Sequence, residues 1–222
     1  MCGRFTLWLQ LGDIIKAFPD LVFPEQLASR YNIAPTQDVA VVPNDGLYRV
    51  QMFRWGLVPF WAKDVAIGSR MINARGETAS EKPAFRAAYR RRRCLILADG
   101  FYEWRREPDS KTKTPMYIRM ASGEPFAFAG LWETWRPDDT PVFSCTIITT
   151  KPNELLAPIH NRMPVILPPE AYDRWLAPEE QRSGSLDDLL VPYSADKMAA
   201  YPVSRYVNSP ANDSPMCIEP AA

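Results

Sequence analysis

Apolar residues recur along the chain mainly in short runs. Within these runs they either alternate with polar residues or follow one another without interruption, and both patterns are typical of β-strands. Tyr48–Trp55 alternates before Gly56 and Pro59 interrupt it. The run "CLILADGFYEW" predicts two strands joined as a hairpin at Asp99-Gly100. Further strands are expected in the remaining runs, at 37–43, 114–120, 126–135, 142–150 and 201–207.

Three segments carry helical spacing instead. They are 7–18, which Pro19 ends, 80–93 with Pro83 in the first turn, and 168–176. Only 183–190 and the chain after Val207 have compositions that predict loose segments. We therefore expect one α+β domain over residues 1–222. Its sheet should be β-rich and curved or barrel-like, with short helices at the periphery.

Composition adds to this picture through 22 prolines, about twice the usual share, and 26 aromatic residues. Because proline breaks helices and is confined to strand edges, we expect short elements and ordered loops. The 26 basic and 26 acidic residues balance. No global field attracts nucleic acid, so any such site must be a local patch.

The four cysteines lie far apart, and the chain has a single histidine. No metal site or cofactor is therefore expected, and a disulfide scaffold is disfavoured. Neither a secretory signal nor a run of ~20 apolar residues is present. These features predict a cytoplasmic, reduced protein, which would keep Cys2 a free thiol.

Cys2 directly follows the initiator methionine in "MCGRF". Removal of Met1 would leave an α-amine, with a pKa near ~8, beside a thiol. Such an aminothiol condenses with an aldehyde: the amine forms an imine, and the thiol closes on it as a thiazolidine. The same terminus could instead attack an amide, or Cys2 could be an ordinary residue near a frayed end.

Two further groups could move protons. His160, between Pro158 and Pro164, titrates near neutrality but could equally be structural. Glu103 stands between Tyr102 and Trp104, where aromatic surroundings would raise its pKa. Strand alternation could equally turn Glu103 to solvent.

Polar and aromatic residues could contact a ligand around these groups. Asn73 can orient an amine or hydroxyl, and Arg75 and Arg4 can bind phosphate. Phe53 and Trp55 are expected in the core, and Phe60 or Trp61 as a stacking platform for bases. Helical spacing places Arg86, Arg90 and Arg93 on one face, either solvated or facing phosphate, and we assign them no role in the site.

Seven motifs occur in order: "MCGRF", "RYNIAP", "WGLVPFW", "INARGET", "ADGFYEW", "HNRMP" and "PVSRYVN". Together they make the chain resemble the SRAP family (SOS response-associated peptidases, or abasic site processing proteins) from Met1 to about Cys217. The resemblance implies covalent crosslinking of abasic single-stranded DNA through Cys2. It also implies side activities as an autopeptidase and an abasic-site lyase.

Carried over by motif, the resemblance makes Cys2 the nucleophile. Asn73 would hold its amine or the sugar, and Glu103 and His160 would act as acid and base, with their roles undivided. The expected DNA-contacting residues are Arg4, Asn32, Pro35, Trp61, Arg75, Trp104 and Arg162. The expected protein is a monomer that binds single-stranded DNA with abasic sites and, if bacterial, joins the nucleoid on damage.

Two other functions remain open. "MCG" also begins mature glutamine-dependent amidotransferases, which predicts an N-terminal-nucleophile amidohydrolase using Cys2. A non-catalytic single-strand-binding module would bind with salt dependence and form no covalent species.

Overall fold

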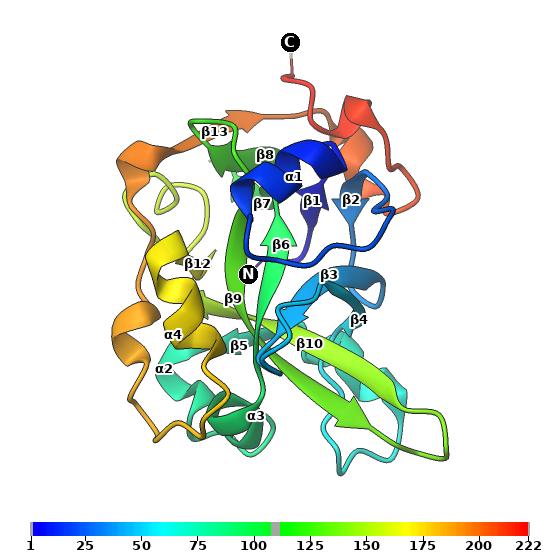
Figure 1. The fold of residues 1–222 in the computed structure, drawn as a ribbon. Coiled ribbons are helices and arrows are strands. Elements are labelled where there is room, and N and C mark those ends of the chain that lie inside the picture. Colours follow the sequence, from blue (N-terminus) through cyan, green and yellow to red (C-terminus); the bar gives the residue numbers. More distant parts are fainter. Residues whose placement is uncertain (1, 108–111, 222) are drawn as a thin grey trace.

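The computed structural model describes residues 2–107 and 112–221, and within them the strands form two sheets that face a shared core (Figure 1). The first sheet has the order β13-β8-β7-β1-β2. The second has the order β11-β10-β4-β3-β6-β9-β12, with β5 beside β10 and a direct β10–β9 pairing. The strands are β1 (Phe5–Leu7), β2 (Arg30–Ile33), β3 (Asp38–Pro43), β4 (Gln51–Trp55), β5 (Asn73–Arg75), β6 (Arg93–Ala98), β7 (Gly100–Arg106), β8 (Lys113–Met120), β9 (Phe126–Trp135), β10 (Val142–Thr150), β11 (Met163–Pro164), β12 (Ile166–Leu167) and β13 (Met198–Pro202).

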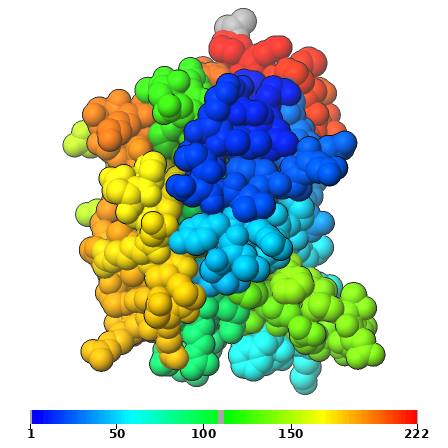
Figure 2. Space-filling view, viewed as in Figure 1, coloured from blue at the N-terminus to red at the C-terminus, as the bar shows by residue number. Residues whose placement is uncertain are grey.

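The helices are short and lie around the sheets (Figure 1). The α-helices are α1 (Leu11–Ala17), α2 (Gly76–Ala79), α3 (Arg86–Arg91) and α4 (Tyr172–Leu176). The longest 3-10 helix of the described residues, η1, spans Val65–Arg70. Figure 2 shows α1 and the chain after it, in blue, covering the upper part of one face. The expected α+β class, with a β-rich barrel-like sheet and peripheral helices, is confirmed.

Aromatic rings join the two sheets across the core. The Phe5 ring of β1 lies 5.0 Å from Trp55 of β4 and 5.7 Å from Phe128 of β9, measured between centroids. The Phe101 ring of β7 lies 6.0 Å from Phe128. These rings are fully buried, and edge-to-face contacts between buried rings stabilise more than their area alone. The predicted core positions of Phe53 and Trp55 are confirmed.

The predicted hairpin at Asp99-Gly100 is wrong. β6 pairs with β3 and β9 in the second sheet, whereas β7 pairs with β1 and β8 in the first. Asp99 is the point at which the chain crosses between sheets. Gly100 fits this crossing because a Cβ there would meet the Tyr117 hydroxyl at 2.1 Å.

The buried Asp99 carboxylate explains the crossing. It accepts hydrogen bonds from the Thr6 hydroxyl (2.5 Å) and from the backbone amides of Trp8 (2.5 Å) and Leu9 (2.8 Å). These contacts take residues 7–9 out of the helix predicted over 7–18, so that Leu7 ends β1 and α1 begins at Leu11. One side chain therefore fixes both the crossing and the N-terminal strand.

Two other sequence expectations also need correction. Arg93 does not share a helix face with Arg86 and Arg90, because α3 ends at Arg91 and Arg93 begins β6. Its buried guanidinium donates to backbone carbonyls, including those of Trp175 (2.9 Å) and Arg90 (2.8 Å). Buried carbonyls next to a helix end need such donors, so this arginine is structural.

Both segments that were expected to be loose make contacts with the rest of the fold. After Val207, Asp213 accepts from the Tyr31 and Asn32 backbone amides, at 2.5 and 3.0 Å. Within 183–190, Leu186 is buried in the core and Asp188 pairs with Arg174.

Replacing Asp99 with alanine should lower the free energy of unfolding by about 3 kcal/mol, because the buried Thr6 hydroxyl and the partly buried Trp8 and Leu9 amides lose a charged acceptor. Urea denaturation at neutral pH measures this. Asp138→Ala, which removes an exposed turn carboxylate that accepts from the Thr140 amide, is the matched control and should cost under about 1 kcal/mol. Equal losses in the two variants would contradict the role given to Asp99.

Candidate active site

Cys2 is held inside the fold although it stands next to the chain end. β1 pairs with β2 on one side (Phe5↔Ile33) and with β7 on the other (Phe5↔Phe101). Cys2 is fully buried, and its Sγ lies 3.9 Å from the Arg4 carbonyl oxygen. Burial, and after it the negative charge of Glu103, raise the pKa of the thiol well above its usual range. Met1 lies outside the described residues, so its removal stays a prediction.

Asn73 contacts Cys2 directly. Its Nδ2 donates to the Cys2 carbonyl oxygen at 2.8 Å. The parallel pairing of β5 with β10 (Asn73↔Ile147) places the amide there. The Asn73 Oδ1 atom is buried and has no hydrogen-bond partner among the described residues. Because a buried acceptor without a donor is costly, Asn73 is suited to receive a donor from a reacting group.

Glu103 lies on β7, opposite Met116 of β8, and its side chain is buried. Alternation therefore does not turn it to solvent. Burial raises the pKa of Glu103 to about 7, although the nearby Lys113 ammonium opposes this shift. The carboxyl can consequently be protonated or ionised near neutral pH, as a proton-transfer group requires.

His160 borders a cleft of about 400 Å³, which is connected to Glu103 through the charge of Lys113 in its lining. Trp104, Arg106 and Lys113 also line it, together with residues 157–161. Burial lowers the pKa of His160; the backbone hydrogen bond with Arg162 raises it, and the positive charges of Lys113 and Arg106 lower it further. The sequence reasoning missed Arg106 and Lys113, which face each other across β7 and β8. Trp104 and Arg106 are two residues apart on one strand and therefore share a face, so this spacing could have indicated Arg106 from the sequence.

Arg4, Asn32 and Trp104 form a connected group, and Trp104 also lines the cleft beside His160. The Arg4 guanidinium donates to Asn32 Oδ1 (2.7 Å) and to the Val207 carbonyl (2.9 Å). It also lies 5.8 Å from the centroid of the Trp104 ring, whose Nε1 donates to Asn208 Oδ1 (2.8 Å). Asn32 is fully buried, and its Nδ2 donates to the carbonyls of Val207, Ser209 and Asn212. These side chains join the N-terminal strand to the C-terminal segment.

Arg75 and Arg162 flank Asn73 and His160. Arg75 is exposed at the end of β5. The Arg162 guanidinium is held by both carboxylate oxygens of Glu77, at 2.5 and 2.8 Å, and by the Thr149 carbonyl at 2.5 Å. Sequence reasoning did not select Glu77, whose position in "RGET" carries no local signal.

Trp61 and Pro35 are not joined to Cys2 by any hydrogen bond or ring contact found within 2–107 and 112–221. Pro35 is half-buried in the turn after β2. Trp61 is 49% exposed and its neighbour Phe60 is 63% exposed, on the loop that follows β4. Solvent-facing rings at these positions suit the stacking platform that the sequence predicts.

The loop that carries these rings is fixed to the fold. Gly56 has φ +127°, and a Cβ there would approach the Gly68 carbonyl oxygen to 2.5 Å. Glycine is therefore required where the loop crosses η1. At its far end, Trp135 Nε1 donates to the Ala62 carbonyl at 2.8 Å. The rings consequently project from a rigid support.

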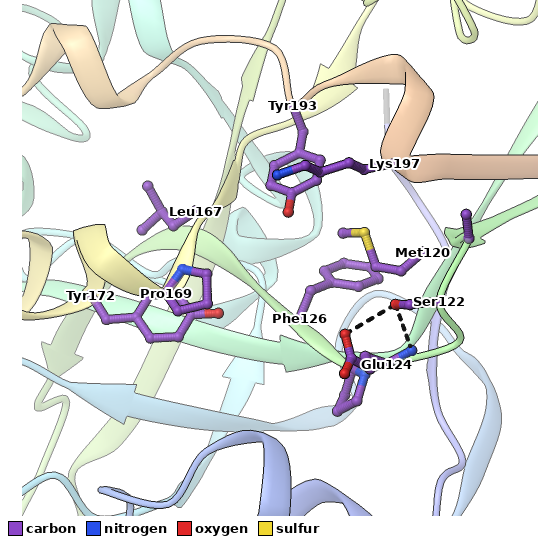
Figure 3. Close-up of a pocket in the computed structure, with 11 residues that line it drawn as sticks. Met120, Ser122, Glu124, Phe126, Leu167, Pro169, Tyr172, Tyr193 and Lys197 are labelled. Carbon is purple, nitrogen blue, oxygen red and sulfur yellow. Dashed lines mark hydrogen bonds between the residues drawn. The ribbon is translucent and has the colours of Figure 1, made fainter.

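A second cavity, of about 430 Å³, lies at the end of β8 remote from Lys113 (Figure 3). Phe126, Tyr172, Tyr193 and Lys197 line it, and the Ser122 hydroxyl donates to Glu124 beside them (3.1 Å). Seven residues of strand separate Lys113 from Met120, a distance of about 23 Å. None of the candidate residues lines this cavity.

Residues 2–107 and 112–221 contain no group of three or more histidine, cysteine, aspartate or glutamate side chains able to hold a metal ion. No helix in this part of the chain has the length and apolar character needed to cross a membrane.

Comparisons with known proteins show which family this chain resembles along almost its whole length. Residues 1–210 match the family model described as "SOS response associated peptidase (SRAP)". The abasic site processing protein YoqW of Bacillus subtilis is 53% identical over 99% of both chains, and YedK of Escherichia coli is 31% identical over 99% of this chain and 100% of its own. A crystal structure of a Bacteroides thetaiotaomicron protein superposes with a TM-score of 0.85 at 28% identity, covering 100% of each chain. The chain belongs to the SRAP family.

Proposed function

We propose that this protein processes abasic sites in single-stranded DNA by forming a covalent thiazolidine between Cys2 and the opened deoxyribose. The observation that carries the proposal is the buried Cys2, whose carbonyl Asn73 holds while Glu103 lies close enough to influence its thiol. The names of the similar proteins YoqW and YedK, abasic site processing proteins, supply the substrate class.

The proposed reaction needs no oxidant, metal or cofactor. An abasic deoxyribose is mainly a closed hemiacetal, and breaking its C1′–O4′ bond releases a C1′ aldehyde. A proton is delivered to O4′ and the 1′-hydroxyl loses one. The Cys2 amine then adds to C1′ and water leaves, which gives an imine. The thiol sulfur adds to the same carbon and its proton passes to the nitrogen, closing the ring with net loss of one water.

Asn73 and Glu103 have distinct parts in this scheme. Asn73 Oδ1, which receives no hydrogen bond within residues 2–107 and 112–221, would accept one from the Cys2 amine and so aim the nitrogen lone pair at C1′. Protonated Glu103 would give its proton to O4′. Since its pKa lies near 7, about half of the carboxyl is protonated at neutral pH.

The DNA would follow the polar and aromatic residues around Cys2. The cleft with Trp104, Arg106 and Lys113 offers two cations and an aromatic edge to a neighbouring nucleotide. Arg75, Trp61 and Pro35 would extend the proposed path. Arg4, Asn32 and Arg162 would act mainly by fixing the segments that carry them, since their side chains are already bonded to other parts of the chain. Local cations suit a protein of zero net charge.

Lyase and autopeptidase activities fit the same residues. An imine that is not trapped permits β-elimination and strand breakage, so the thiol decides between shielding the lesion and cutting the strand. Removal of Met1 would require attack on the bond before Cys2, for which the same thiol and carboxyl are at hand. The protein is proposed to act as a cytoplasmic monomer.

Cys2→Ala should abolish the denaturation-stable adduct with a single strand containing one abasic site, while strand cleavage through the untrapped imine increases. Denaturing gel electrophoresis measures both products. Cys94→Ala, which removes another fully buried thiol, should form the adduct normally. Persistence of the adduct in Cys2→Ala would refute the mechanism, and release of ammonia from glutamine by the wild type would favour the amidohydrolase instead.

The rate of adduct formation should show a bell-shaped pH profile. The rate should rise with pH as the Cys2 amine, with an ordinary pKa of about 8, loses its proton. It should fall as Glu103, with a pKa of about 7, loses its own, so the maximum lies between about pH 7 and 8. Glu103→Gln should slow the reaction at pH 7 by about 100-fold and remove the alkaline fall, because no carboxyl remains to titrate. Binding of an intact strand, measured by fluorescence anisotropy, should stay nearly unchanged. An alkaline limb that survives in Glu103→Gln would assign the falling limb to another group.

A further inference from the structure

The only histidine of the chain has one ring nitrogen fixed by the backbone. The Arg162 backbone N–H donates to His160 Nδ1 at a distance of 3.0 Å. A nitrogen that accepts a hydrogen bond from an amide carries a lone pair and no proton. In the neutral imidazole the proton is then on Nε2, across the ring from the 160–162 turn.

A second contact of the same nitrogen tests this assignment. Nδ1 also lies 3.2 Å from the Arg162 carbonyl oxygen, which could accept from a protonated Nδ1. If Nδ1 were protonated, however, its hydrogen would point at the hydrogen of the Arg162 amide. The amide nitrogen is the closer of the two backbone atoms, at 3.0 Å from Nδ1. The two contacts therefore exclude each other, and the amide contact favours the neutral ring. Burial, the largest influence, and the cations Lys113 and Arg106 lower the pKa of His160, whereas the Arg162 backbone contact raises it, and the net lowering favours the neutral ring.

Arg162 can hold the ring because its own side chain is anchored twice. Its guanidinium donates to both Glu77 carboxylate oxygens and to the Thr149 carbonyl of β10. The Arg162 side chain is only 15% exposed, whereas that of Glu77 is 53% exposed. A two-point arginine–carboxylate pair fixes orientation better than a single contact does. The turn that presents the amide to His160 is thus fastened from α2 and from β10.

We propose that Glu77 is a positioning residue which, through Arg162, holds His160 as the neutral Nε2–H tautomer, so that His160 acts as a hydrogen-bond donor in the site rather than as its base. This inference rests on the proposed function for its chemical consequence, but the tautomer itself is a property of the protein alone. It divides the two proton-handling roles: Glu103 transfers the proton to the sugar, and His160 polarises a sugar oxygen without giving up its proton.

This division of roles between Glu103 and His160 accounts for every proton in the ring-opening step. With Nδ1 bonded to the Arg162 amide and Nε2 protonated, the ring has no lone pair directed at the substrate. Full donation from Nε2 would leave an imidazolate, which is far too basic to form near neutral pH. The proton that breaks the C1′–O4′ bond must then come from Glu103, and His160 stabilises the oxygen on which negative charge develops.

Because the chain has one histidine, the imidazole signals in the nitrogen-15 NMR spectrum of the uniformly labelled protein without DNA come from His160 alone. At pH 7 the spectrum should show a protonated Nε2 and an unprotonated Nδ1. A proton on Nδ1, in either the neutral or the charged ring, would overturn the proposal.

Glu77→Gln should weaken the hold on Arg162 and raise the proportion of the Nδ1–H tautomer of His160. Adduct formation should slow by roughly ten-fold, a part of the ~10²–10⁴-fold that positioned acid–base groups contribute. Glu77→Asp, which keeps the charge, should restore part of both effects. The matched control is Glu180→Gln, which removes a surface carboxylate paired with Arg90 and Arg91 and should change neither tautomer nor rate.

The outcomes separate this proposal from the proposed function. An unchanged tautomer in Glu77→Gln would refute the role of Glu77. A shifted tautomer with an unchanged adduct rate would refute the role of His160 as a donor in the reaction. If the wild-type protein forms no adduct while its ring has the expected tautomer, the crosslinking function fails and the structural assignment stands. Thermal unfolding within ~2 °C of wild type shows that a variant remains folded.

Discussion

Pairing of β1 on both of its edges is the constraint on which the remaining structure depends. A terminal segment ordinarily frays, but β1 lies between β2 and β7, and Asp99 binds the backbone just beyond it. Arg4 and Asn32 then attach the C-terminal segment to the same region. A residue at the start of the chain can therefore be placed as accurately as one in the core, which a terminal nucleophile requires.

The same arrangement lowers stability at the reacting groups. Glu103 has a folded pKa of about 7, above the value near 4.5 of an exposed glutamate. The folded protein thus binds the proton more tightly than the unfolded chain. The stabilisation is complete below pH 4.5 and is lost as the pH rises through 7. Asn73 adds a buried carbonyl oxygen that receives no hydrogen bond from the part of the chain that the structure describes. Unfavourable burial of polar groups around one terminus is typical of sites whose groups are arranged for a substrate.

Local patterns predicted the elements better than their partners. The runs at 114–120, 126–135 and 142–150 form β8, β9 and β10, and 168–176 contains α4, because alternation and spacing depend only on neighbours in sequence. The Asp99 crossing could not be predicted, since the amides that select it lie some 90 residues away. The meeting of Cys2 with Asn73 likewise depends on the β5–β10 pairing. Local chemistry singled out Cys2, Glu103, His160 and Asn73, and the family resemblance joined them into one candidate site, whereas the positions of Glu77, Arg106 and Lys113 could be found only from the three-dimensional arrangement.

The candidate site straddles the two sheets, and this determines which groups can move together. Cys2 and Glu103 belong to the first sheet, through β1 and β7. Asn73 and His160 depend on β10 of the second sheet, which pairs with β5 and with β11 directly after Arg162. The 2.8 Å contact between Asn73 and the Cys2 carbonyl joins the two halves. A small shift between the sheets would move Cys2 and Glu103 together away from Asn73 and His160. The aromatic contacts of Phe5 with Trp55 and Phe128, which oppose such a shift, therefore support the geometry of the site as well as the core.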